Sequence, residues 1–417
     1  METLVIFTQW TWLKMNEKTY RSEITVIKKS HWLHPYCDTM CFKSKNLYNR
    51  ANYLIRRSNE TGNDFIGAFE LNKIMKIEDC FQAMPSKTSQ QVVIQLCDNW
   101  RAFFKAMKDW GKNKSKYNGM PKPPKYKDKM KGRNVVKFDY MQGSFKDGKY
   151  YFSRKDRKKV EYVETLVTKE NFILCRIVPY GNCYKIEMIY KTETVEPKEN
   201  NDRYLAIDLG VTNFATLTNN IGSQSIVING RILKSINNYY NKQRAKALSY
   251  IGRGSSNRTY KIDFKRNNIM NHHMHKISRW IIDYCVENDI NTICIGLNHD
   301  WQRSSNLGKK INQKFVQIPF LKFIQKLEYK AKDAGIKVIL TEESYTSKAS
   351  FIDNDEMAKN VECSGKRIKR GLYLSADGIQ INADVNGSYN ILRKCNPEFK
   401  YDGIKGLSLN PVRMNLF

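Results

Sequence analysis

The sequence predicts an α+β protein of several domains, from its length and from two changes of hydrophobic pattern. The chain has 417 residues, which is too long for one small core. Its first part changes from strand-like alternation to helical spacing and back to short strand-like pieces. From residue 204 onward, strand and helix patterns alternate. The polar, proline-containing stretch 192–203 separates the two parts, and we interpret it as a linker.

The composition points to a polyanionic partner. Lys and Arg number 71 against 41 Asp and Glu, a formal net charge of +30. Nucleic acid is the first candidate and an anionic membrane the second. No apolar run reaches the roughly 18 residues of a membrane-spanning helix. The ten cysteines are scattered without a C-x-x-C pair, which indicates free thiols in a reducing cytoplasm.

The first part predicts a β-domain interrupted by helices. Residues 1–18 are expected to be a leader outside the folded part, since Met15 offers a second possible start. Residues 19–36 and 134–196 are strand-like and predict a small, wedge-like β-barrel or a sheet. Between them, 37–133 is predicted to be a helical recognition domain, because apolar residues recur there at three- and four-residue steps up to about Trp110.

Two basic stretches are candidates for nucleic-acid contact. The segment 111–133 is rich in Lys and Pro, which predicts a loop or an extended arm that follows a phosphate backbone; a solvated loop is the alternative. The segment 364–371 is a second cluster, suited to holding single-stranded DNA near metal ions. The candidate residues are Lys112, Lys114, Lys116, Tyr117, Lys122, Lys125, Tyr126, Lys127, Lys366, Arg367, Lys369 and Arg370.

The second part predicts an RNase H-like domain of mixed α/β type. Strands are expected at 204–209, 212–218, 225–231, 292–297 and 336–342, with helices at 264–286 and 318–335 and a last helix from about Asp384. In such a sheet, carboxylates at strand ends and at the start of a late helix converge on two metal ions. We expect 200–344 and 384–417 to form this domain, and 345–383 to be a target-nucleic-acid-binding insertion.

Asp208 and Asp384 are the first candidate ligands. Asp208 ends an apolar strand, where the charge of a Mg²⁺ ion would offset the cost of burying a carboxylate. The alternative is a simple turn that Gly210 completes. Asp384 begins an apolar-periodic segment, and an acid in the first turn of a helix is favourable even without a metal. Each signal alone is therefore weak.

Four segments resemble successive motifs of one protein family. They are "IDLGVTNFATL", "GLNHDWQRSSNLGKKINQKFVQIPF", "YKAKDAGIKVILTEESYTSKASF" and "NADVNGSYNILRK". In this order they resemble the TnpB (OrfB) proteins of bacterial insertion sequences, which are relatives of the type V CRISPR effectors. The resemblance runs from about residue 19 to 395.

The resemblance implies an RNA-guided DNA endonuclease with a RuvC-type site that uses two Mg²⁺ ions. Asp208 and Asp384 would be its first and last catalytic carboxylates. Residues 19–196 would bind a guide RNA encoded by the same element, together with a short motif beside the double-stranded target DNA. One copy or two would assemble on each RNA.

This chain departs from the family pattern at two places. Gly296 stands where the family carries a glutamate, and the two cysteine pairs of a zinc ribbon are missing, since the corresponding interval holds only Cys363. We therefore expect no structural zinc.

The missing glutamate has two interpretations. One is an inactive nuclease. The other is a relocated ligand, Glu342 or Glu343, at the end of the next strand. Neighbouring strands lie about 4.8 Å apart, so a glutamate can reach across a glycine that has no side chain. We favour Glu343 because it is closer to the turn, which gives Asp208, Glu343 and Asp384 as metal ligands. Acids that merely solubilise a strand end are the alternative, and Asp300 and Asp353 are weaker substitutes.

The sequence therefore predicts a Mg²⁺-dependent, RNA-guided DNA endonuclease that hydrolyses the phosphodiester by a two-metal mechanism. A nuclease-inactive, RNA-guided DNA-binding repressor is the alternative. A transposase that joins DNA strands itself is a second alternative, which the carboxylates alone do not exclude.

Overall fold

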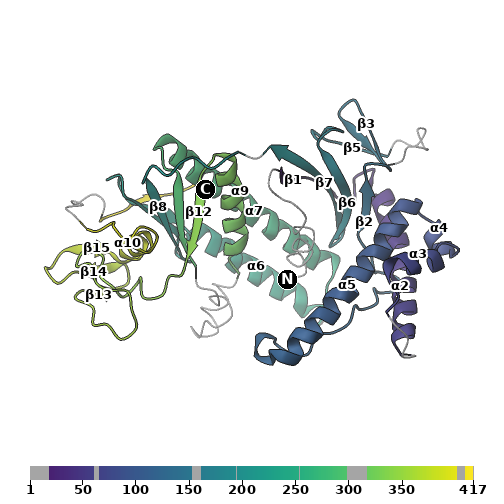
Figure 1. The fold of residues 1–417 in the computed structure, drawn as a ribbon, viewed down its shortest axis with the longest axis horizontal. Helices are drawn as coiled ribbons and strands as arrows, with labels where there is room; N and C mark the ends of the chain where they lie inside the picture. The colour runs from purple at the N-terminus through teal and green to yellow at the C-terminus, as the bar shows by residue number, and fades with distance from the viewer. Residues whose placement is uncertain are drawn as a thin grey trace. The chain divides into compact units, whose positions relative to one another are not determined.

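The computed structural model describes residues 18–60, 65–152, 161–193, 195–252, 254–297, 317–401 and 409–416. The chain divides into two compact units, Met1–Glu193 and Thr194–Phe417, whose elements Figure 1 labels. The expected leader 1–18 lies outside the described residues except for Lys18, which begins the first strand. No helix in the described part of the chain is both long and apolar enough to cross a membrane.

The first unit contains the predicted helical segment. Its helices are α2 (His34–Glu60), α3 (Ala68–Met75), α4 (Asp79–Gln82) and α5 (Ser86–Lys112). The long helices α2 and α5 pack together through apolar side chains at helical spacing, among them the fully buried Leu47, Ile55 and Leu96. Helical structure predicted between 37 and 110 is thus confirmed, and α5 runs two residues further.

The strands of the first unit come from both sides of this helical segment. A four-stranded sheet has the order β1 (Lys18–Ile27), β7 (Cys183–Glu193), β6 (Phe172–Tyr180) and β2 (Val136–Asp139). A smaller sheet contains β3 (Ser144–Lys146), β4 (Lys149–Tyr151) and β5 (Tyr162–Glu164). Strand β1 pairs with β7 over its whole length. The pairs among the described residues do not close into a ring, so the barrel stays a prediction.

The basic segment that follows α5 forms an extended arm along α2. After one short 3₁₀ turn, η1 (Lys114–Lys116), no regular element occurs before β2. Polar side chains of α2 bind the arm through its backbone: Asn49 exchanges two hydrogen bonds of 2.8 Å with the backbone of Lys127. Asn52 donates to the carbonyl of Pro124 at 3.1 Å. The loop or extended arm predicted for 111–133 is present after Lys112, since 111–112 belong to α5, and these hydrogen bonds hold it along α2.

The second unit is built on a six-stranded sheet. Its order is β12 (Lys337–Thr341), β11 (Thr292–Gly296), β8 (Tyr204–Leu209), β9 (Asn213–Asn219), β10 (Ile226–Asn229) and β16 (Val412–Met414). Strands β12, β11 and β8 are parallel, whereas β9 runs antiparallel to β8. The carboxyl ends of three neighbouring strands therefore lie at one edge, which is where ligands bind in open α/β sheets.

Helices pack on both faces of this sheet (Figure 1). They are α6 (Arg231–Ser249), α7 (Asn257–Glu287), α9 (Phe320–Asp333) and α10 (Ala383–Cys395). Leu205 and Ile207 of β8 join the core that contains α7 and α9. Tyr204 and Ala206, on the other face of β8, pack with α10. The mixed α/β architecture is confirmed, and the RNase H-like assignment stays a prediction.

A small three-stranded sheet precedes α10. It contains β13 (Lys366–Lys369), β14 (Leu372–Leu374) and β15 (Gln380–Asn382). Phe351, Tyr373 and Ile381 form a local core that includes Tyr389 of α10. The segment 345–383 is thus packed against the helix that carries Asp384.

Candidate active site

Asp208 lies on the face of β8 that α10 covers. Strand side chains alternate between faces, so Asp208 shares the face of Tyr204 and Ala206. Helix α10 comes close to it because Gly387 has no side chain. A Cβ atom at position 387 would lie only 3.2 Å from Oδ2 of Asp208. Two segments that are far apart in the sequence thereby meet at this carboxylate.

The surroundings of Asp208 disfavour its ionised form. Its pKa is raised well above the usual value, first by burial and then by the negative charges of Asp384 and Glu343, while Arg367 acts in the opposite direction. Both of the other acids predicted from the sequence therefore act on Asp208 through their charge. A bound cation would relieve this repulsion.

Glu343 lies beside the glycine that replaces the expected acid. The parallel register pairs Gly296 of β11 with Thr341 of β12, and Ile295 of β11 with Ile207 of β8. Gly296 is therefore level with Asp208. A Cβ at position 296 would lie 3.1 Å from Oε2 of Glu343 and 2.5 Å from Cδ1 of Ile391. The glutamate carboxylate thus occupies space that any side chain at 296 would need.

The two neighbouring glutamates differ in environment. The side chain of Glu342 is 67% exposed, whereas Glu343 is half-buried. Burial raises the pKa of Glu343, with a smaller increase from Glu342 and a decrease from Lys394. Lys394 of α10 also donates to the carbonyls of Glu342 at 2.9 Å and of Ser344 at 2.7 Å. Helix α10 therefore fixes the turn that presents Glu343, and this geometry favours Glu343 over Glu342.

Asp384 lies in the first turn of α10. Asn382 caps this helix, since its Oδ1 accepts hydrogen bonds from the backbone N–H groups of Asp384 and Val385. The carboxylate oxygen Oδ2 accepts a 2.6 Å hydrogen bond from Nδ2 of Asn213, and Nη2 of Arg367 lies 3.8 Å from Oδ1. With a side chain 33% exposed, Asp384 forms the accessible side of the site.

The second basic cluster partly reaches this site. Arg367 is on β13 beside Asp384, and Nη2 of Arg370 donates to Oγ1 of Thr212 at 3.1 Å, four positions after Asp208. Lys366 and Lys369 are exposed on β13. A planar guanidinium is well suited to bind phosphate in two-pronged fashion. Nucleic-acid contact by this cluster stays a prediction.

The candidate residues of the first unit lie on and before the extended arm. Lys112 ends α5, and Lys114 lies over the ring of Trp110. Asp109 accepts hydrogen bonds from Lys116 and Tyr117. The remaining candidates on the arm are exposed, namely Lys122, Lys125, Tyr126 and Lys127. Their role also stays a prediction.

Metal binding requires a fit between ligands and ion. Within the described ranges, no three His, Cys, Asp or Glu side chains are gathered closely enough to enclose a metal ion as they stand. Two observations nevertheless fit a hard cation. Asp384 and Glu343 both act on Asp208 through their negative charge. The buried Oδ1 of Asn213 has no hydrogen-bond partner among the described residues. Carboxylate, amide and water oxygens are the ligands that Mg²⁺ prefers.

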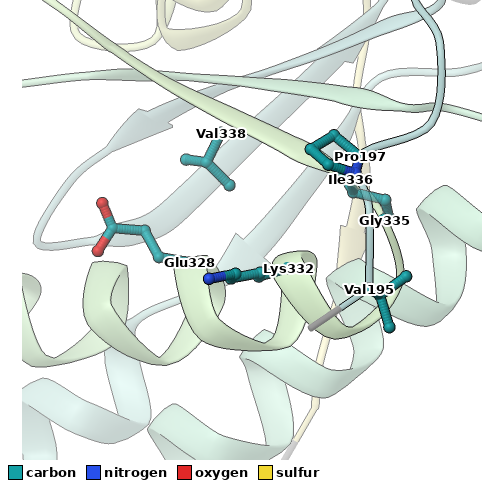
Figure 2. A pocket seen from close by; sticks show the side chains of 7 residues that line it. All are labelled: Val195, Pro197, Glu328, Lys332, Gly335, Ile336 and Val338. Atoms are coloured by element: carbon teal, nitrogen blue, oxygen red, sulfur yellow. The ribbon is translucent and has the colours of Figure 1, made fainter. Parts of the chain in front are cut away.

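Asp353, the weaker substitute that the structure describes, is bound elsewhere. Asp353 accepts a hydrogen bond from the backbone N–H of Ala376, within the insertion. Asp300 lies outside the described residues. A hollow of about 310 Å³ lies at the beginning of β12, the end opposite to Glu343, and Figure 2 shows its lining. Val195, Pro197, Glu328, Lys332, Gly335, Ile336 and Val338 line it. We therefore place the candidate active site at the acids and not in this hollow.

Two protein-family models match the unit that carries the acids. Residues 187–302, including Asp208, match the OrfB_IS605 model, described as a probable transposase. Residues 320–391, including Glu343 and Asp384, match the model of a Cas12f1-like TNB domain. These matches confirm the resemblance of the chain to the TnpB (OrfB) proteins and their type V relatives.

Individual relatives are more distant. A "CRISPR-associated endodeoxyribonuclease Cas12f1" of Sulfoacidibacillus thermotolerans is 31% identical over 144 residues, which are 34% of this chain and 31% of that protein. The chain thus aligns with about a third of this relative's length. The cryo-EM structure of a Cas12f1–sgRNA–target DNA complex is similar with a TM-score of 0.36 at 14% identity, covering 91% of this chain and 100% of that one. The mini-RNA-guided endonuclease CRISPR-Cas_phi3 gives a TM-score of 0.42 at 10% identity, covering 99% and 96%.

Three residues of the candidate site are not predicted from the sequence. Asn213, Asn382 and Lys394 contact Asp384 or the turn at Glu343. Asn382 had a local signal, since asparagine before an apolar-periodic segment is typical of a helix cap. The contacts of Asn213 and Lys394 depend on tertiary packing, which no local pattern reports.

Proposed function

We propose that this chain is an RNA-guided DNA endonuclease of an insertion sequence, and that Asp208, Glu343 and Asp384 hold two Mg²⁺ ions. One observation carries the proposal: the carboxylate of Glu343, two residues beyond the end of β12, lies over Gly296, and Gly296 is level with Asp208. The resemblance places the family's acid at this glycine. An acid that only solubilised a strand end would point to solvent, as Glu342 does.

The surrounding residues have distinct tasks in this proposal. When bound, the metal ions supply an activated water and stabilise the charge that develops on the attacking and leaving oxygens. Lys394 and Asn382 hold the backbone of two ligands in place. Arg367 and Arg370 stand beside the acids and are suited to orient the phosphate of a DNA strand.

Guide RNA and double-stranded DNA are the proposed partners. Base pairing would read the target, while the protein reads backbone shape and a short flanking motif. The net charge of +30 and the arm along α2 support backbone contact. The family matches and the endodeoxyribonuclease relative support the same reaction class. Three further points stay predictions: the number of copies per RNA, a location in the bacterial cytoplasm and the absence of structural zinc.

The proposal is tested by reconstitution. The protein is purified with its co-expressed RNA and incubated with target DNA and Mg²⁺. We expect cleavage that Asp208→Ala abolishes and that Cys363→Ala preserves, since Cys363 is the lone cysteine of the insertion. Cleavage that persists in Asp208→Ala would reject the proposed site.

The two adjacent glutamates provide a matched pair. Glu343→Gln removes a proposed ligand at nearly constant shape, so we expect cleavage to fall by about 100-fold or more. Glu342→Gln changes the exposed neighbour and is expected to leave the rate within about twofold. Equal effects of the two changes would contradict the relocation of the acid.

A guided DNA-binding repressor is the second candidate. It is favoured by the absence of an acid at position 296 and by the lack of a closed three-acid group among the residues described. It predicts specific binding of guided targets without cutting, and binding that Asp208→Ala does not change. Binding and cleavage measured on the same preparation distinguish the two. Religation of the products would instead indicate the strand-joining alternative.

A further inference from the structure

Asn213 connects the β8–β9 hairpin to the helix that carries Asp384. Its Nδ2 donates a 2.6 Å hydrogen bond to Oδ2 of Asp384. This contact determines which way the amide points, because an ionised carboxylate only accepts hydrogen bonds. The reversed amide would place two acceptors against each other. The carbonyl oxygen Oδ1 therefore points away from Asp384.

That carbonyl oxygen is buried, and no group in the described part of the chain hydrogen-bonds to it. Burying an acceptor without a partner costs free energy, and such acceptors are rare in native proteins. An unpartnered acceptor of this kind is usually completed by a water or an ion. This acceptor belongs to the same Asn213 amide whose N–H group binds Asp384, a proposed metal ligand.

The backbone gives Asn213 little freedom to turn elsewhere. A Cβ at Gly210 would lie 2.6 Å from the carbonyl oxygen of Asn213, and a Cβ at Gly230 would lie 2.8 Å from that of Val211. The N–H of Gly230 also donates to the carbonyl of Thr212 at 2.8 Å. Two glycines thus permit a tight turn that presents the Asn213 side chain in one direction.

We propose that Asn213 is a positioning residue of this site. Its amide N–H holds the Asp384 carboxylate, and its carbonyl oxygen accepts a hydrogen bond from a water in the shell of the metal ion. The inference rests on the proposed function and adds a named residue to it. Mg²⁺ keeps several of its waters in proteins, so such acceptors are needed. Loss of partners behind the direct ligands typically lowers metal affinity or activity by about 10- to 100-fold.

A purely structural role makes a different prediction. If Asn213 only linked the hairpin to α10, its loss would lower thermal stability and leave the metal requirement unchanged. If it positions Asp384 and a metal-bound water, its loss raises the metal concentration needed. The dependence on metal therefore separates the two roles.

The test compares Asn213→Ala with Asn241→Ala in the full chain. Asn241 is a suitable control because its amide is also hydrogen-bonded, to Gln317 in the same unit, away from the acids. Mn²⁺ binding to the protein without nucleic acid is followed by electron paramagnetic resonance. The Mg²⁺ concentration for half-maximal cleavage is measured on the RNA-bound protein. For Asn213→Ala we expect the Mn²⁺ affinity to fall and the Mg²⁺ concentration for half-maximal cleavage to rise, each by about 10-fold or more. For Asn241→Ala we expect each to change by less than about twofold.

Guided DNA binding and the thermal midpoint verify that each variant folds, and Asn213→Ser takes the place of alanine if that variant does not. An unchanged metal dependence in the Asn213 variant overturns the inference while the nuclease proposal stands. If the wild type does not cleave, the nuclease proposal fails and Mn²⁺ affinity alone decides the role of Asn213. Both proposals are overturned if the wild type binds no Mn²⁺, or if Asp208→Ala does not weaken the Mn²⁺ binding of the wild type.

Discussion

Asp208 is a residue whose surroundings lower the stability of the folded chain at neutral pH. Its carboxyl group is surrounded by protein and by the charges of two other acids, which raise its pKa. A carboxyl with a raised pKa binds its proton more tightly in the folded than in the unfolded chain. The folded state is therefore favoured at low pH, and this contribution is lost as pH rises above the unfolded value of about 3.9.

Asp208→Asn should consequently stabilise the metal-free protein at neutral pH. We expect the thermal midpoint in EDTA to rise by about 2–4 °C at pH 7, because asparagine has no carboxylate to bury beside two other acids. The difference should shrink towards pH 4, and also on addition of Mg²⁺, which stabilises only the wild type. Scanning calorimetry across these conditions checks the prediction. A variant that is less stable than the wild type in EDTA at pH 7 would contradict it.

Gly296 is a second residue whose environment makes a clear prediction. In Gly296→Ala the new methyl group would lie 2.5 Å from Ile391 and 3.1 Å from Glu343, so at least one of them must move. We expect a loss of stability of about 1–3 kcal/mol from overpacking, together with slower cleavage. Gly67→Ala is the matched control, because nothing lies within 4 Å of the added carbon there. Thermal unfolding and cleavage rates should be unaffected by this control change.

The sequence predicts single residues only where their type is unusual for its place. Asp208 and Asp384 stand out as acids at the ends of apolar patterns in a basic chain. The pair Glu342–Glu343 stands out for the same reason, but strand alternation did not choose between them because β12 is apolar on both sides. The choice depends on exposure and on the space above Gly296, which only the packed structure reveals.

Among the elements, α10 has the largest part in building the site. Its first turn carries Asp384, its middle contacts Asp208 through Gly387, and its last turn carries Lys394. Ser388 fixes it to the sheet by donating to backbone carbonyls of β8 and β9. Small movements of this helix would therefore displace several parts of the site together.

Lys394→Met should uncouple the helix from the turn that carries Glu343. The aliphatic stem is preserved, whereas the carbonyls of Glu342 and Ser344 lose their donor, which costs about 1–3 kcal/mol where the groups stay buried. We expect lower stability and a cleavage rate reduced by about 10-fold or more. Lys332→Met, at an exposed lysine of α9, is the control. Equal cleavage rates of the two variants would show that the turn at Glu343 does not depend on the hydrogen bonds from Lys394.

Elements with strong periodicity could be predicted, and short or polar ones could not. Helices α7 and α9 were expected from apolar residues at helical spacing, and Met274, Ile277 and Leu327 are indeed fully buried. Helix α6 was not predicted, because few of its side chains are buried and its sequence is mostly polar. Strands β13 to β15 are three or four residues long, too short for alternation to be detected.

For the whole molecule, charge is the dominant property. Neutralising phosphates releases counterions, so affinity for nucleic acid should fall by about 10³- to 10⁵-fold between 50 and 200 mM salt if six to ten phosphates are contacted. The double change Lys125→Ala and Lys127→Ala should reduce the slope of log affinity against log salt by about 1.4 for a single strand. Fluorescence anisotropy measures both. The exposed Lys169→Ala is the control, and an equal slope change there would argue against contact by the arm.

The division of the chain into an N-terminal and a C-terminal unit was also expected from the sequence. The boundary after Glu193 falls within the polar stretch interpreted as a linker. Long-range pairing was harder to predict: β1 joins β7 across more than 150 residues, and β16 joins β10. Such pairs depend on the whole fold, so local pattern gives no register for them.

The filled space above Gly296 also restricts how this sequence can change. With Ile391 and Glu343 occupying that volume, Gly296→Glu in one step would introduce a bulky, charged side chain where even a methyl group collides. An acid at position 296 would therefore require coordinated exchange at two or three positions. Under the proposed function, we expect a chain with glycine here to depend on the neighbouring glutamate.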